Sequence, residues 1–200
     1  DEDYLYFNAS LSYYATNFKK IYDEWNEELF NSLVEKWKLP LTKKFIDYSK
    51  GMKRLAMFAL AISHNPKLLI LDETTAGLDP ISRKELLDIL RGYVEDGEKS
   101  ILFSSHITSD LDKIADYLVI INNGEILEET SIDEIENRYV VISGDNKLIE
   151  NCNFELFGLS KGTTTFEALA YRKDVKEVTD INKKTPNIEN IITYMLGDSK

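Results

Sequence analysis

The sequence predicts an α/β protein in which a helical part precedes a parallel sheet and a small α+β extension follows it. Apolar and aromatic residues recur at helical spacing over residues 10–38. Short apolar runs then alternate with helical segments as far as residue 121, which is typical of a parallel sheet with crossover helices. We therefore expect a helical subdomain over 1–65, part of an α/β core over 66–138 and an α+β appendage over 139–200.

The composition limits the class of protein. The 200 residues are 43% hydrophobic, as in an ordinary globular chain, and carry a formal net charge of −11. That charge disfavours a surface built to hold nucleic-acid backbones, which needs clustered Lys and Arg. Cys152 is the single cysteine, so no internal disulfide is possible. The longest apolar stretches fall far short of the ~20 residues that span a bilayer.

The helical part begins with an aromatic stripe that we interpret as a packing face rather than a base-stacking or cofactor surface. Pro40 ends this region, and a further helix is expected from Gly51 to His64, before Asn65-Pro66. His64 is expected only to cap the end of that helix.

The core elements follow in order. Leu68–Leu71 is a continuous apolar run, typical of a strand buried on both faces of a parallel sheet. A helix over Pro80–Val94 starts with a suitable cap, Asp79, and a proline at its first position. The elements expected next are a strand at Ser100–Ser104, a helix at Ser109–Ala115, a strand at Tyr117–Ile121 and a hairpin turn at Asn122-Asn123-Gly124.

The appendage has weaker patterns. We expect strands at Tyr139–Ser143 and Phe166–Tyr171 and a final helix at Ile188–Leu196. These patterns point to no chemistry, and its role stays open between a regulatory tail and a dimer-stabilising extension.

Two acidic residues, Asp72 and Glu73, end the first apolar strand and should lie at the carboxyl edge of the sheet, where α/β proteins bind ligands. Phosphoryl transfer needs one carboxylate to hold Mg²⁺ and a second group to orient the attacking water. The next parallel strand ends at Ser104-Ser105-His106, so His106 should lie close to Glu73. Taken alone, the acidic pair fits an ordinary acidic turn equally well.

A phosphate-binding helix start is a second candidate. Tyr48-Ser49-Lys50-Gly51-Met52 opens a helix, whose free N–H groups and partial positive charge suit a phosphate. Ser49 adds a hydroxyl and Gly51 permits close backbone approach. The alternative is a serine cap without a ligand.

The order of Tyr48–Met52, Leu68–Glu73, Ala76-Gly77-Leu78-Asp79 and His106 resembles the ATP-binding-cassette (ABC) ATPase family of P-loop NTPases over roughly residues 1–130. In that family these segments are the signature motif, the Walker B strand, the D-loop and the switch histidine. The resemblance implies an ATP-binding and ATP-hydrolysing subunit that powers membrane transport. It also implies ATP and Mg²⁺ as cofactors.

The resemblance assigns roles to single residues. Asp72 would bind Mg²⁺ through water, Glu73 would act as general base or orient water, and His106 would contact the γ-phosphate. The segment Ser49, Lys50, Gly51 and Met52 would reach, with Asp79, toward ATP held by the opposite subunit of a homo- or heterodimer.

The implied partners are transmembrane transporter subunits, contacted by the helical subdomain, and no nucleic acid. The implied location is cytoplasmic, peripheral on the inner face of the cell membrane. Lys50 and Met52 replace the commoner Gly and Gln of the signature, which resembles bacterial ABC-2 type exporters with separate membrane subunits. Thr74 stands where the family often has Pro. Neither the transported substrate nor a certain direction can be read from these residues.

The family's Walker A loop, G-x-x-x-x-G-K-[ST], has no counterpart in this sequence. The segment Gly92–Ser100 carries one residue too many and leads into a strand rather than a helix. Since the chain starts at Asp1 in mid-pattern, with 1–6 near the family's Q-loop, we expect a piece truncated before Walker A that does not bind ATP alone. We also expect it to expose apolar sheet surface and to be marginally stable or to self-associate.

Two other hypotheses remain. One is a non-catalytic ABC-like interaction or regulatory module, which the retention of Asp72, Glu73 and His106 disfavours. The other is a translation or DNA-repair relative of the cassette family, which the acidic charge and the lack of long heptad runs disfavour.

Overall fold

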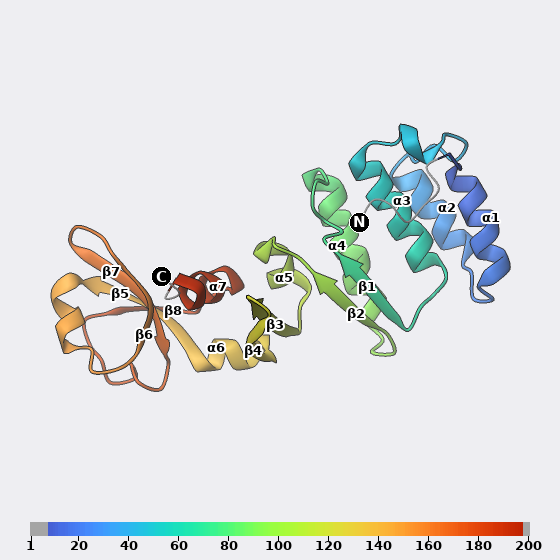
Figure 1. Ribbon diagram of the computed structural model, residues 1–200. Helices are drawn as coiled ribbons and strands as arrows, with labels where there is room; N and C mark the ends of the chain where they lie inside the picture. Colours follow the sequence, from blue (N-terminus) through green and yellow to red (C-terminus); the bar gives the residue numbers. More distant parts are fainter. Residues whose placement is uncertain (1–7, 198–200) are drawn as a thin grey trace. The chain divides into compact units, whose positions relative to one another are not determined.

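The computed structural model describes residues 8–197, and the chain forms two compact units, Asp1–Ile107 and Thr108–Lys200 (Figure 1). The expectation of a Q-loop near residues 1–6 lies outside the described residues. The three-part division predicted from the sequence stays a prediction. None of the described helices is both long and apolar enough to cross a membrane.

The first unit begins with helices that surround an aromatic core. They are α1 (Leu11–Ile21), α2 (Glu27–Lys36), the 3-10 helix η1 (Phe45–Asp47) and α3 (Lys50–Ser63). The region predicted as helical over 10–38 is two helices, because Asn26 caps α2 by accepting the Leu29 N–H at 2.9 Å. Only part of the aromatic stripe packs inward: Tyr14 and Phe30 are buried, whereas Tyr22 is 38% exposed.

A two-stranded parallel sheet follows, in which β1 (Leu68–Asp72) pairs with β2 (Ser100–Ser104). Helix α4 (Pro80–Val94) connects the two strands. The register runs from Leu68 opposite Ser100 to Asp72 opposite Ser104. Asp79 caps α4, and Pro80 is its first residue, as predicted.

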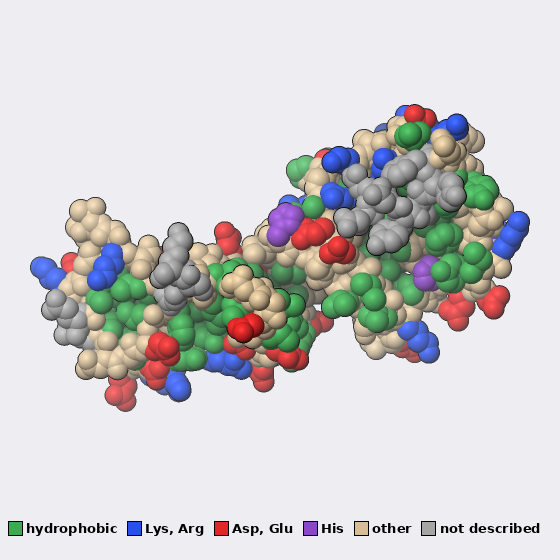
Figure 2. Space-filling view, in the orientation of Figure 1, with side chains coloured by type: hydrophobic (Ala, Val, Ile, Leu, Met, Phe, Trp, Pro, Cys, Tyr) green, Lys and Arg blue, Asp and Glu red, His purple; other side chains and the backbone are tan. Residues whose placement is uncertain are grey.

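The prediction that β1 is buried on both faces is wrong for this chain. Leu69 and Leu71 are buried, whereas Leu68 is 53% and Ile70 is 66% exposed. Leu102 of β2 is 62% exposed beside them. Hydrophobic side chains accordingly reach the molecular surface among the charged ones (Figure 2).

The second unit begins with a helix and a hairpin. Its elements are α5 (Thr108–Ile114), β3 (Tyr117–Asn122), β4 (Glu125–Ser131), α6 (Ile132–Arg138), β5 (Tyr139–Asp145), η2 (Asn146–Asn151), β6 (Leu156–Lys161), β7 (Thr165–Tyr171), β8 (Asn182–Lys184) and α7 (Ile188–Gly197). The strands β3 and β4 are antiparallel, and Asn123 and Gly124 between them have φ angles of 50° and 83°. Two residues with positive φ are what a tight hairpin of this kind requires, so the turn residues explain the hairpin.

A four-stranded antiparallel sheet in the order β6-β7-β5-β8 forms the rest of the second unit. Val140, Ile142, Phe166 and Ala168 lie in its core. Helix α7 packs on β6, where Gly158 has a φ of 59° and a Cβ would lie 2.5 Å from Cα of Tyr194. A glycine is therefore required at this crossing.

The sequence patterns missed α6, β6 and β8. Helix α6 is only 7 residues long, too short for periodicity to mark it. Its signal was the local pattern Ser131-x-x-Glu134, since the Ser131 hydroxyl accepts the Glu134 N–H at 3.2 Å. β8 has 3 residues, all exposed, and its pairing with β5 is decided by the sheet rather than by its own residues.

Candidate functional site

The carboxyl ends of β1 and β2 bring Glu73 and His106 together. Nδ1 of His106 lies 2.5 Å from Oε2 of Glu73, and the backbone N–H of His106 donates to Oε1 of Glu73 at 3.0 Å. The two contacts use both carboxylate oxygens of Glu73. They hold the carboxylate against the turn that follows β2, at the sheet edge where the sequence predicted the pair.

The imidazole of the pair is accessible to solvent, whereas Oε2 of Glu73 is buried. The side chain of His106 is 71% exposed and that of Glu73 is 35% exposed. A side-chain contact of this exposure adds little to folding stability. The contact between Glu73 and His106 therefore matters for the geometry of the site, because it places an imidazole beside a carboxylate at the edge of the sheet.

Asp72 lies next to this pair and is held by the neighbouring strand. The Ser104 hydroxyl donates to Oδ1 of Asp72 at 2.5 Å. Glu73 itself has a φ of 48°, a left-handed conformation that is uncommon for a residue with a side chain. Its N–H donates to the carbonyl of Ser104 at 3.1 Å, which fixes the kink at the end of β1.

A tight loop leads from Glu73 into α4. The N–H of Ala76 donates to the carbonyl of Glu73 at 3.2 Å, and Gly77 has a φ of 73°. Asp79 closes the loop, and its Oδ1 accepts the N–H groups of Ile81 at 3.0 Å and Ser82 at 3.1 Å. Hydrogen bonds from the side chain and the backbone of Ser82 lower the pKa of the Asp79 carboxyl, so it stays ionised as a helix cap.

The start of α3 adjoins that loop. Ser49 caps the helix, and its hydroxyl accepts the Met52 N–H at 3.2 Å. A Cβ at Gly51 would lie 3.6 Å from the carbonyl oxygen of Gly77, so the two loops approach within van der Waals contact. Lys50 is exposed at the first position of the helix.

The predicted residues therefore fall into two groups within the first unit. Asp72, Glu73 and His106 meet at the sheet edge. The segment Ser49–Met52 and the loop that ends at Asp79 meet at Gly51 and Gly77.

The donor set at the sheet edge suits Mg²⁺. The described residues contain no group of three or more His, Cys, Asp or Glu side chains that could enclose a metal ion. Mg²⁺ differs from most metals in that one or two carboxylates together with substrate phosphates are enough to hold it. Asp72, a carboxylate at the open end of β1, meets that requirement.

The segment Gly92–Ser100 is not a phosphate loop in the structure. Gly92 lies inside α4, and β2 begins at Ser100, so the segment joins a helix to a strand. A phosphate loop needs the opposite order, with its N–H groups at the start of a helix.

Ser104 was missed as a member of this site by sequence reasoning, which noted it only as the end of a strand. The available signal was a hydroxyl residue at the last position of β2, directly opposite Asp72 in the register.

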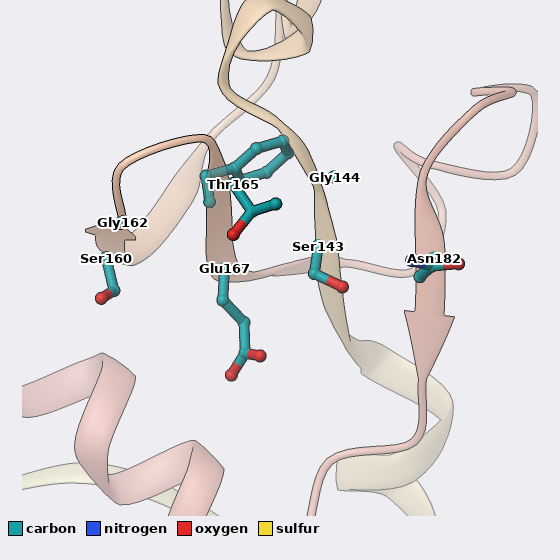
Figure 3. Close-up of a pocket in the computed structure, with 8 residues that line it drawn as sticks. Ser143, Gly144, Ser160, Gly162, Thr165, Glu167 and Asn182 are labelled. Carbon is teal, nitrogen blue, oxygen red and sulfur yellow. The ribbon is translucent and has the colours of Figure 1, made fainter.

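The second unit has a polar cavity of about 360 Å³ that no sequence pattern indicated (Figure 3). A row of polar residues crosses the sheet there in register: Ser160, Glu167, Ser143 and Asn182. The hydroxyl of Tyr194 in α7 donates to Oε1 of Glu167. Glu167 thus has a partner in α7, and nothing in the row resembles the phosphate chemistry of the first unit.

Comparisons with known proteins find similar sequences and a similar structure. Residues 4–76 match the family model for ABC transporters. The bacitracin transport ATP-binding protein BcrA of Enterococcus faecalis is 42% identical over 174 residues, covering 78% of this chain and 56% of that protein. The lantibiotic transport ATP-binding protein SrtF of Streptococcus pyogenes is 42% identical over 90 residues, covering 45% of this chain and 39% of that protein.

A solved structure, described as the ATP-binding subunit of an ABC transporter, is also similar. It has a TM-score of 0.59 and 28% identity, over 66% of this chain and 57% of that structure. The chain thus spans only about two fifths to a little over half of these relatives. Family model, relatives, fold and motif order agree, and the chain belongs to the ATP-binding subunits of ABC transporters.

Proposed function

We propose that this chain is the C-terminal part of a subunit that hydrolyses ATP to drive membrane transport. We further propose that the direction of this transport is export. The observation that carries the proposal is the pairing of Glu73 with His106 beside Asp72, at the edge where β1 and β2 end. The names of the relatives, which are bacitracin and lantibiotic transport ATP-binding proteins, support transport of a peptide antibiotic.

Each residue of the site has a proposed task. Glu73 orients the attacking water and takes its proton, because its carboxylate is held in place by two contacts with His106. His106 contacts the γ-phosphate of ATP through its imidazole. Asp72 holds Mg²⁺ through water, and the ion supplies charge neutralisation on the phosphate oxygens when bound.

The start of α3 serves a second subunit in this proposal. Ser49, Lys50, Gly51 and Met52 face ATP that is bound by the partner of a homo- or heterodimer, and Asp79 in the adjoining loop lies at the same interface. A helix of 14 residues capped by Ser49 offers N–H groups and a partial positive charge to phosphate oxygens. The Ser49 hydroxyl can also donate its hydrogen to a phosphate, because accepting the Met52 N–H uses a lone pair of the oxygen.

The remaining assignments follow the same proposal. The phosphate-binding loop lies outside this chain, so the chain alone does not bind ATP. The helical subdomain docks on transmembrane subunits, which places the protein at the cytoplasmic face of the membrane.

Calorimetry with Mg²⁺-ATP tests the proposal, with the 200-residue chain beside a protein extended upstream to the full cassette. We expect no heat of binding from the short chain and clear binding by the long one. Glu73→Gln in the long protein should keep binding but lower kcat by about 10²-fold or more, the usual range for a positioned base. Tight binding of ATP by the short chain, or unchanged turnover in the variant, contradicts it.

A further inference from the structure

Ser104 contacts both acidic residues of the proposed site. It is the last residue of β2 and lies opposite Asp72 in the parallel register. Its hydroxyl oxygen is 2.5 Å from Oδ1 of Asp72 and 3.3 Å from the backbone nitrogen of Glu73. Its carbonyl oxygen is 3.1 Å from the same nitrogen.

The direction of these hydrogen bonds is fixed by chemistry. The backbone N–H of Glu73 can only donate, so the Ser104 hydroxyl oxygen accepts from it. An ionised carboxylate can only accept, so the Ser104 hydroxyl hydrogen goes to Asp72. The result is a chain from Glu73 N–H through Ser104 O–H to Asp72, and its last bond is strengthened by the carboxylate charge.

The backbone of Glu73 makes this anchor important. A φ of 48° is left-handed, and a residue with a side chain keeps that conformation only where its surroundings enforce it. The N–H of Glu73 is shared between the carbonyl and the hydroxyl of Ser104. Ser104 therefore helps to set the direction in which the Glu73 carboxylate leaves the end of β1.

We propose that Ser104 is a positioning residue that holds the carboxylates of Asp72 and Glu73 in one arrangement through a single hydroxyl. This inference rests on the proposed function, in which Asp72 holds the metal and Glu73 orients the water. A small side chain with a hydroxyl is required at this position, because an apolar residue would release both contacts at once.

The test uses the full-length protein with Ser104→Ala, Ser104→Thr and a matched control, Ser100→Ala. Thr keeps the hydroxyl and suits an exposed strand position, whereas Ser100 lies at the opposite end of the same strand. Four readouts are compared with wild type. They are kcat, KM for ATP, Mn²⁺ binding in the presence of nucleotide by EPR, and hydrogen exchange of the Glu73 amide by NMR.

For Ser104→Ala we expect kcat to fall and the Mn²⁺ dissociation constant to rise by about 10- to 100-fold, as for other residues that orient a metal ligand. KM should stay within about threefold, because the change affects the reacting arrangement rather than general substrate binding. Exchange of the Glu73 amide should become faster. Ser104→Thr should restore all three properties, and Ser100→Ala should behave as wild type.

Several results would overturn the proposal. One is a Ser104→Ala protein with wild-type kcat, Mn²⁺ affinity and amide exchange. Another is a Ser100→Ala protein that loses as much kcat and Mn²⁺ affinity as Ser104→Ala. A third is a Ser104→Thr protein that loses as much and also has a lowered Tm. Either result would mean general damage to the strand. Absence of ATP hydrolysis in the wild type would instead refute the proposed function, while amide exchange would still decide whether Ser104 holds Glu73.

Discussion

Nδ1 of His106 lies 2.5 Å from Oε2 of Glu73, although 33 positions separate the two residues in the chain. Parallel pairing of β1 with β2 creates this proximity, because it brings the carboxyl ends of both strands to one edge. The backbone N–H of His106 adds a second contact, to the other oxygen of the same carboxylate. The imidazole and the carboxylate are thus oriented toward each other before any substrate is present.

His106→Ala in the full-length protein should lower kcat by about 10²-fold while changing the free energy of unfolding by less than about 1 kcal/mol. The reason for the difference is the 71% exposure of the imidazole, which makes the pair weak for folding but available to substrate. Steady-state ATPase assays and urea unfolding measure the two quantities. The control is His64→Phe, which keeps a ring stacked on Tyr22 and should leave kcat unchanged. A stable His106→Ala protein with full activity would contradict the assigned role.

Tyr48 should make the stability of the first unit sensitive to alkaline pH. Burial raises the pKa of its phenol to about 12, above the value of about 10 expected in the unfolded chain. Because the folded state favours the neutral form, this stabilisation is complete below pH ~10 and is lost as pH rises toward ~12. Absorbance titration of wild type against Tyr48→Phe should show one tyrosine ionising near the higher value.

The same variant tests the hydrogen bond from the Tyr48 hydroxyl to the carbonyl of Pro40, which is 2.6 Å long. At neutral pH, Tyr48→Phe should lower the free energy of unfolding by about 1 kcal/mol, because the carbonyl loses its donor while the ring stack on Phe45 stays. The deficit relative to wild type should shrink between pH ~10 and ~12. Tyr13→Phe, at a tyrosine that is 58% exposed, is the control. A deficit that does not change with pH would argue against the raised pKa.

Gly158→Ala should destabilise the second unit by about 2–4 kcal/mol, from the left-handed backbone and the clash together. The new Cβ would lie 2.5 Å from Cα and 2.7 Å from the carbonyl oxygen of Tyr194, both backbone atoms that cannot turn aside. Gly92→Ala in α4 is the matched control, since nothing lies within 4 Å of its Cβ position. That change should stabilise by about 0.5–1 kcal/mol. Urea unfolding of both variants measures whether their free energies of unfolding change in these opposite directions.

The exposed apolar residues of the parallel sheet should cause the 200-residue chain to self-associate. Ile70 and Leu102 are 66% and 62% exposed on neighbouring strands, beside Leu68. Light scattering should show a mass that rises with concentration, and Ile70→Thr with Leu102→Thr should reduce the rise. Ile81→Thr, at a residue 73% exposed in α4, should have little effect. A compact monomer at every concentration would refute the expectation.

Much of the first unit could be predicted because its signals are local. Asp79-Pro80 marked the start of α4, and the apolar run at Leu68 marked β1, each within a residue of the observed bounds. The hairpin turn at Asn123-Gly124 could be predicted equally well, because it needs residues that adopt positive φ. The second unit was harder to predict, since β8 and α6 are short and gain their order from the sheet and hairpin around them.

The sequence by itself determined which residue types would stand at the ends of the strands: Asp72 and Glu73 after one apolar run and His106 after the next. Their chemical character and order in the chain are properties of the residues alone. Only the tertiary structure decided that Ser104 holds both acidic residues and that Glu73 adopts a left-handed backbone. These contacts arise from the pairing of strands about 30 residues apart, and no local propensity encodes a register between segments so distant in sequence.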